Sequence, residues 1–229
     1  MKPNPILHSR HVLATGLLAS LLSTGLAGAA TTLIDPTTNN GSFEYVNGVN
    51  NPAFTAKITH WDTHSEGDVD NWTLWAGVAT SSDDSGIQHS TSTTDGVRFA
   101  FLQPGNAVYN LTSYFAAAGD SFTFSWDHIG GNYAHTVSLV YFNGTDVISI
   151  AASGVDSGTA PGNGKGGTYV IPDDSPAIGY QIGLGVVNNS VDWPNIDNFV
   201  LSVESVPEPS TALLGGLGLL ALFQRRKTR

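Results

Sequence analysis

The chain has no cysteine among its 229 residues. This absence excludes disulfides, thiol nucleophiles and zinc sites built on thiolates. The folded chain must therefore be stabilised by its packed core or by a bound metal ion.

Basic residues are also scarce. Nine Lys and Arg stand against 19 Asp and Glu, which gives a net charge of −10. Away from the two chain ends, the only basic residues are Lys57, Arg98 and Lys165. Such an acidic body repels nucleic acid and anionic lipid, so we expect no nucleic-acid partner.

Long hydrophobic runs are absent as well. The apolar run near the C-terminus, Ala212–Phe223, has 12 residues, and three of them are glycine. As a helix it would span about 18 Å, against about 30 Å for the hydrocarbon core of a bilayer. The segment predicts a short hydrophobic helix that anchors the chain transiently. A permanent anchor that is never cut is the alternative.

The N-terminus has the three parts of a secretory signal peptide. Lys2 and Arg10 are its basic residues, Val12–Leu22 is its apolar region, and Ala27-Gly28-Ala29 is a cleavage site for signal peptidase. A first transmembrane helix is the alternative. The expected organisation is therefore a signal peptide at 1–29, a folded domain at 30–205 and a C-terminal signal at 206–229.

Alternating apolar residues predict strands throughout the folded domain. In Ser121–Asp127, Phe122, Phe124 and Trp126 share one face. Strands are also expected around Val137–Tyr141, Val147–Ile150 and Ile182–Val186. The last one contains two alternating sets, Ile196, Asn198 and Val200 against Phe199, Leu201 and Val203, and the second set is the stronger core candidate. Weaker strand candidates lie near Leu33 and at 58–61, 72–75, 97–102, 107–111 and 168–171.

Turn residues separate these runs about every eight to twelve residues, which is typical of an all-β sandwich, and a jelly roll fits the length. The stretches 81–95 and 152–167 are rich in Ser, Asp and Gly, so they are expected to be loops. Gly162–Gly167 fits the letters of a dinucleotide-binding motif, but a strand-like segment follows it, so we expect a flexible loop there.

The C-terminal residues resemble a PEP-CTERM sorting signal. The resemblance rests on Pro207-Glu208-Pro209, on the glycine- and leucine-rich run, and on the basic tip that contains Arg225 and Arg226. It implies recognition of the Pro-Glu-Pro box by an exosortase-type membrane protease. It also implies a Gram-negative host that makes exopolysaccharide, and delivery to the cell surface or extracellular matrix. Exopolysaccharide is therefore an expected partner.

Three short segments resemble galactose-binding-like and carbohydrate-binding-module jelly rolls. They are Asn40-Gly41-Ser42-Phe43-Glu44, Asn71-Trp72-Thr73 and Ile196-Asp197-Asn198-Phe199-Val200-Leu201. The resemblance implies that Glu44 and Asp197 ligate a structural Ca²⁺, which binds carboxylate and carbonyl oxygens. The alternative is that both carboxylates cap strands or hydrogen-bond turns.

The tryptophans are candidates for stacking on sugar rings. Trp126 alternates with Phe122 and Phe124, which predicts a core position, and Trp72 occupies a structural position in the resembling family. Trp61, Trp75 and Trp193 remain as ligand-binding candidates, although core packing is the default for such side chains.

No catalytic motif stands out. A G-x-S-x-G nucleophile elbow is absent from the sequence, and the adjacent carboxylate pairs lie in loop-like segments. We therefore expect a non-catalytic binding or structural module. A lectin-like module with a defined glycan ligand is the alternative, and a polysaccharide hydrolase is a third hypothesis.

Overall fold

The structure is a computed structural model of the chain. It describes residues 29–46, 48–50, 57–59, 69–80, 85–89, 96, 98–130, 134–156, 162–206 and 218. The compact unit that forms the folded domain comprises Ala30–Glu204.

Strands dominate the described part of the chain. In chain order they are β1 (Thr31–Ile34), β2 (Tyr45–Val46), β3 (Val49–Asn50), β4 (Lys57–Thr59), β5 (Thr73–Leu74), β6 (Ser85–His89), β7 (Arg98–Phe101), β8 (Ala107–Phe115), β9 (Ser121–Gly130), β10 (His135–Phe142), β11 (Val147–Asp156), β12 (Gly162–Val170), β13 (Gln181–Asn188) and β14 (Asn195–Glu204).

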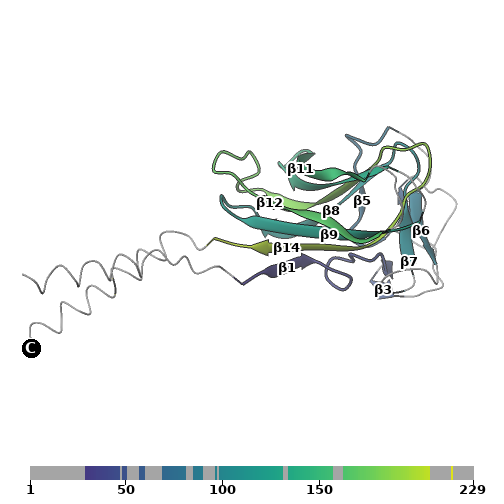
Figure 1. The fold of residues 1–229 in the computed structure, drawn as a ribbon, viewed down its shortest axis with the longest axis horizontal. Helices are drawn as coiled ribbons and strands as arrows, with labels where there is room; N and C mark the ends of the chain where they lie inside the picture. Colours follow the sequence, from purple (N-terminus) through teal and green to yellow (C-terminus); the bar gives the residue numbers. More distant parts are fainter. Residues whose placement is uncertain are drawn as a thin grey trace, which may run out of the picture. The chain divides into compact units, whose positions relative to one another are not determined.

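Most of the strands form two antiparallel sheets that pack face to face, and β2 and β3 form a separate two-stranded sheet. Within the described residues, the larger sheet has the order β12-β9-β14-β7-β6-β4, with β1 also paired to β14, and the smaller has the order β11-β10-β13-β8-β5. Figure 1 shows β11, β8 and β5 above β9 and β14. This arrangement confirms the predicted all-β jelly-roll sandwich.

The alternation of apolar residues positions the core between the sheets. Phe122, Phe124 and Trp126 of β9 are each at most 3% exposed, as the sequence predicts. Residues of β10 and β13, including Leu139 and Leu184, face them in the same hydrophobic cluster. The indole N–H of Trp126 also donates to Nε2 of His135 across the sandwich, at 2.9 Å.

A β-bulge in β14 explains why both alternating sets of that strand contribute to the core. Asp197 pairs with Asp127 and Val200 pairs with Ser125, so β14 has one more residue than β9 between these pairs. Asn198 occupies the bulge with a φ of 51°. The extra residue changes the phase of the alternation, and Ile196 and Phe199 are therefore both fully buried.

Two segments expected to be loops contain strands. β6 lies within 81–95, where it pairs with β7. The stretch 152–167 contains the end of β11 and most of the glycine-rich part of β12, which pairs with β9. The prediction of a flexible loop at Gly162–Gly167 is therefore wrong, since hydrogen bonds to β9 hold this segment in the sheet.

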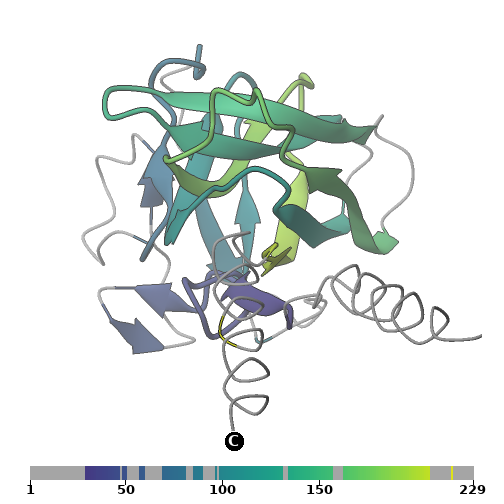
Figure 2. The same cartoon turned by 90° about the vertical axis from the view of Figure 1, so that its left-hand side faces the viewer.

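The folded domain has two distinct ends. At one, Thr31 pairs with Val203, so β1 begins where β14 ends. Figure 2 shows β1 in purple, close to the yellow-green β14. We call this the terminal end. At the other, which we call the distal end, β14 begins at Asn195, opposite Gly130.

Candidate functional site

A tightly hydrogen-bonded loop joins β13 to β14 at the distal end. The buried side chain of Asn188 donates to the carbonyl of Leu102 at 2.8 Å and to that of Asp192 at 2.7 Å. Its Oδ1 accepts from the backbone N–H and the hydroxyl of Ser190, both at 2.8 Å. The hydroxyl of Ser190 also reaches the carbonyl of Asp192, at 2.7 Å. These contacts fix the loop on the sheet.

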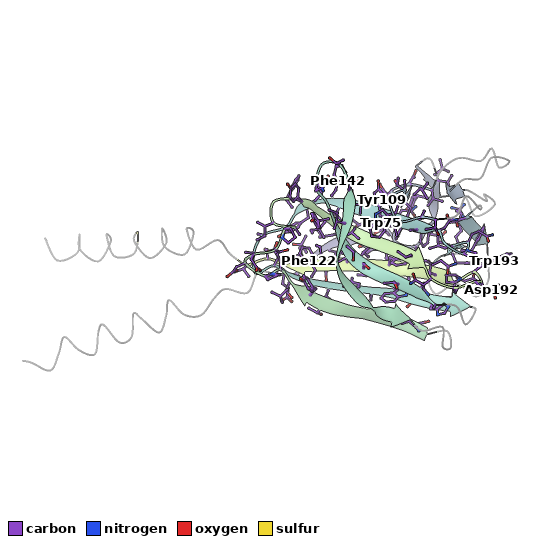
Figure 3. All side chains as sticks on the ribbon, turned by 90° about the horizontal axis from the view of Figure 1, so that it is seen from above. Trp75, Tyr109, Phe122, Phe142, Asp192 and Trp193 are labelled. Carbon is purple, nitrogen blue, oxygen red and sulfur yellow. The ribbon has the colours of Figure 1, made fainter. Side chains whose placement is uncertain are left out.

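Trp193 and Val191 project from this loop. Trp193 is 50% exposed and Val191 is 90% exposed. The ring centroid of Trp193 lies 6.4 Å from that of the buried Phe101, at an interplanar angle of 45°. Figure 3 shows Trp193 and Asp192 at one end of the domain and Phe122 toward the other. The structure therefore places one predicted ligand-binding tryptophan on the surface, with its ring against that of Phe101.

A half-exposed indole on a fixed loop can bind a flat apolar surface. Aromatic rings offer a large contact area at low entropic cost, and the surrounding amides and hydroxyls can orient a polar ligand. The sequence predicts a binding role for Trp193 but not for Val191. The signal for Val191 was weak, because a lone valine among Asn, Ser and Asp is ordinary loop composition.

Trp75 has a different environment from Trp193. It is 5% exposed and packs with Ala107 and Val140 on the outer face of the smaller sheet. A Cβ added at Gly185 would lie 2.5 Å from Cζ3 of Trp75, so the absent side chain makes room for the indole. The indole N–H donates to the carbonyl of Val147 at 2.9 Å. Trp75 therefore covers this face with its own ring, and its role in ligand binding stays a prediction.

Glu44 lies against β7. It is 5% exposed, and its Oε1 accepts from the backbone N–H of Arg98 at 2.8 Å. The guanidinium Nη1 of the buried Arg98 donates to the backbone carbonyl of Glu44. Gly96 makes room for the carboxylate, because a Cβ there would lie 2.2 Å from Oε1.

Asp197 lies at the bulge of β14 and is fully buried. Its Oδ1 accepts from the backbone N–H of Asn198 at 2.8 Å. On the neighbouring strand, Asp127 accepts from the side-chain amide of Asn198 at 3.0 Å and from the N–H of Gly164 at 2.6 Å. The hydrogen bonds to these carboxylates fix the bulge of β14 and the first residues of β12.

The structure brings together the two chain segments that suggested a calcium site. The backbone N–H of Phe199 donates to the carbonyl of Gly41 at 2.8 Å, and the rings of Phe43, Trp72 and Phe199 form a buried cluster. In the described residues, however, no group of three or more His, Asp or Glu side chains is placed to hold a metal ion. An ion at Glu44 would also share that residue with the guanidinium of Arg98. The donor set therefore fits calcium poorly, and calcium stays a prediction.

Several predicted residues lie outside the described part of the chain. They are Trp61, Pro207, Glu208, Pro209, Arg225 and Arg226. Within the described part, no helix has the length and apolarity needed to cross a bilayer.

Comparison with known proteins identifies the C-terminal segment. Residues 205–227 match the PEP-CTERM protein-sorting motif, which confirms the resemblance seen in the sequence. The motif implies an exported protein that is membrane-anchored before processing by an exosortase. None of the curated proteins matches the chain.

Solved structures are similar to the folded domain. The Stig cyclase Fisc from Fischerella sp. TAU, in complex with (3Z)-3-(1-methyl-2-pyrrolidinylidene)-3H-indole, is 14% identical with a TM-score of 0.55, and the match covers 78% of this chain and 100% of that one. A second cyclase structure from the same organism is 13% identical with a TM-score of 0.53, covering 78% and 100%. At such identities the similarity shows the fold alone.

Carbohydrate-binding modules are among the other structural neighbours. The CBM22-1 xylan-binding domain from Paenibacillus barcinonensis Xyn10C is 13% identical with a TM-score of 0.44, and the match covers 79% of this chain and 99% of that domain.

Proposed function

We propose that the chain is a surface-sorted protein whose β-sandwich is a non-catalytic carbohydrate-binding module. In this proposal the tail holds the precursor at the inner membrane until an exosortase recognises Pro207, Glu208 and Pro209. The processed protein then resides at the cell surface or in the extracellular matrix, where exopolysaccharide is the ligand class. The sorting motif at 205–227 supports the first part of this sequence of events.

The observation that carries the binding role is the supported, half-exposed ring of Trp193. The hydrogen bonds of Asn188 and Ser190 fix the loop before any ligand arrives, so binding would cost little ordering entropy. The apolar face of a sugar ring can stack on an indole while the neighbouring polar groups bond its hydroxyls. The loop lies at the distal end of the sandwich, opposite the end at which β14 finishes.

Binding of the folded chain to exopolysaccharide tests the proposal. Trp193→Ala should weaken sugar-competable binding by about tenfold, which is typical of a central aromatic contact. Phe115→Ala is the matched control, because Phe115 is also an exposed aromatic residue, at 59%, but lies at the terminal end. The affinity of the Phe115→Ala variant for exopolysaccharide should equal that of the parent.

Other outcomes would replace the proposal with one of its alternatives. Binding that soluble sugars do not compete, or that both variants retain, would favour a structural matrix module. Release of reducing sugars from the polysaccharide would show that the module is catalytic. The alternative glycosidase would need a carboxylate pair with separate acid and base roles.

A further inference from the structure

Two loops of the sandwich lie at its terminal end, beside the start of β1 and the end of β14. The first joins β8 to β9 and the second joins β12 to β13. Gln181 pairs with Phe115, and Val170 pairs with Ser121 next to Glu204 on β14. We call the surface formed by residues 115–120 and 170–180 the terminal face.

Large apolar side chains are exposed on this face. Phe115 is 59% exposed, Val170 55%, Tyr180 39% and Ile178 37%. The small residues Ala117 and Ala118 are also exposed between Phe115 and β9. Single exposed apolar residues are ordinary, but their concentration at one end indicates a contact surface.

Backbone hydrogen bonds connect the two loops. The N–H of Ala116 donates to the carbonyl of Tyr180 at 3.0 Å, and that of Gly179 donates back to Ala116 at 2.8 Å. The N–H of Gly119 donates to the carbonyl of Ile171 at 2.8 Å, and the N–H of Ile171 donates to the carbonyl of Asp120 at 2.9 Å. Contact with lipid requires backbone polar groups to be satisfied within the protein. These loops meet that requirement where they are bonded to each other.

The length of the chain that follows β14 limits how far the terminal face can lie from the bilayer. β14 ends at Glu204, the sorting motif begins at 205, and the apolar run begins at Ala212. The intervening segment reaches at most about 28 Å when fully extended. While the apolar run is in the bilayer, the terminal face is therefore held at high effective concentration near the lipid surface.

We propose that the terminal face of the tail-anchored precursor lies on the bilayer surface, with Phe115, Val170, Ile178 and Tyr180 in the headgroup region. Tyrosine suits that region, because its ring is apolar and its hydroxyl can remain hydrated. The exposed Asp146, Asp173, Asp174 and Glu204 lie in loops or at a strand end on the same side of the sandwich. Their charge favours zwitterionic over anionic lipid. The inference rests on the membrane-anchored stage of sorting and is independent of carbohydrate binding.

Site-specific fluorescence can test this arrangement, because the chain has no cysteine of its own. Ala118→Cys on the terminal face and Val191→Cys at the distal end each accept one environment-sensitive label. The labelled full-length chains are reconstituted in phosphatidylcholine vesicles that contain a headgroup-attached quencher, and the chains that float with the vesicles are measured. The label at 118 should lose emission and shift to the blue, while the label at 191 should do neither. Equal access of aqueous iodide to both labels would overturn the proposal.

A second set of variants tests the apolar side chains themselves. The double substitution F115S/I178S should abolish the quenching of the label at 118, while Val49→Ser, which removes another exposed side chain elsewhere on the domain, should retain it. Flotation of every variant reports whether the tail is still anchored, so a failure of the anchor is distinguished from a failure of the face. Addition of phosphatidylglycerol should reduce the quenching, and an increase would contradict the preference for zwitterionic lipid.

Discussion

Glu44 can hold the start of the domain in two ways, by its hydrogen bond to Arg98 or by ligating calcium. Its substitution distinguishes them. Its carboxylate accepts from the buried backbone N–H of Arg98. Glu44→Ala should lower the free energy of unfolding by about 1–3 kcal/mol, because it leaves that donor without its acceptor. Glu44→Gln retains an oxygen acceptor and should cost less. Denaturant unfolding of both variants measures the difference.

The same samples test the calcium prediction. An ion bound only by the native state stabilises it, so excess EDTA would lower the melting temperature of the parent if Glu44 and Asp197 hold calcium. Glu44→Ala would then show little further change with EDTA. A parent melting temperature that is identical with and without EDTA would contradict the calcium site and leave the Arg98 contact as the clamp.

Tyr114 provides a test at alkaline pH. Burial, followed by the hydrogen bond and the charge interaction with Asp120, raises the pKa of Tyr114 from 10.0 to about 12. Because the folded-state pKa is the higher one, this stabilisation is fully present below pH 10 and is lost as the pH rises toward 12.

Tyr114→Phe should cost about 1–2 kcal/mol at neutral pH through loss of the hydrogen bond to Asp120. The parent should lose more stability than the variant between pH 9 and pH 12, so the gap between their urea midpoints should narrow. A constant gap over that range would show that the hydroxyl does not couple folding to pH.

The candidate site was only partly predictable from single residues. Trp75 and Trp193 look alike in the sequence, since each lies in a short mixed segment. Their exposure differs because Gly185, on a strand far along the chain, makes room for the ring of Trp75. Trp193 instead lies half in solvent, with its ring beside that of Phe101. Side-chain size at distant positions therefore decides which aromatic ring remains accessible.

At the level of single elements, the bulge in β14 is a sensitive position. Asn198 has a φ of 51°, which β-branched residues adopt at high cost. Asn198→Val and Asn198→Gly both lose the bond to Asp127, but only valine has the unfavourable backbone. The free energy of unfolding of the Asn198→Val variant should therefore be about 1–3 kcal/mol lower than that of the Asn198→Gly variant. Equal denaturant midpoints for the two variants would show that the bulge relaxes without cost.

Strands with clear alternation were predictable, and strands poor in apolar residues were not. β9 and β13 follow a period of two, and the structure has them as expected. β12 begins Gly-Asn-Gly-Lys-Gly-Gly, which has no apolar period at all. Its conformation comes from the ladder with β9, where a Cβ at Gly166 would lie 2.0 Å from the carbonyl oxygen of Phe124. Glycine here allows close approach of two backbones, whereas sequence alone favours a loop.

For the whole molecule, the sorting motif gives a direct prediction. Glu208→Ala should leave the full-length precursor in the membrane fraction, because the Pro-Glu-Pro box is the expected recognition element of the exosortase. Pro172→Ala, a substitution in an exposed turn of the folded domain, is a control that should be processed normally. Cell fractionation reports whether each variant stays in the membrane fraction, and intact mass measurement reports whether it has been cleaved. Processing and release of the Glu208 variant at the parental level would contradict this role of the box.

The position of β14 also determines how the protein would respond to mechanical force. Trp193 lies two positions before the first residue of this strand, and the C-terminal segment follows its other end. While the precursor is held by that segment, tension between a ligand at Trp193 and the membrane would therefore run along the strand, which has β9 on one side and β7 and β1 on the other. Force along the strand would load the backbone hydrogen bonds between β14 and its neighbours in shear, so these bonds would share the load. Only a force perpendicular to the strand would break them one at a time. If the proposed polysaccharide ligand is bound there, drag on it would therefore load the strand in a direction that requires many hydrogen bonds to break together.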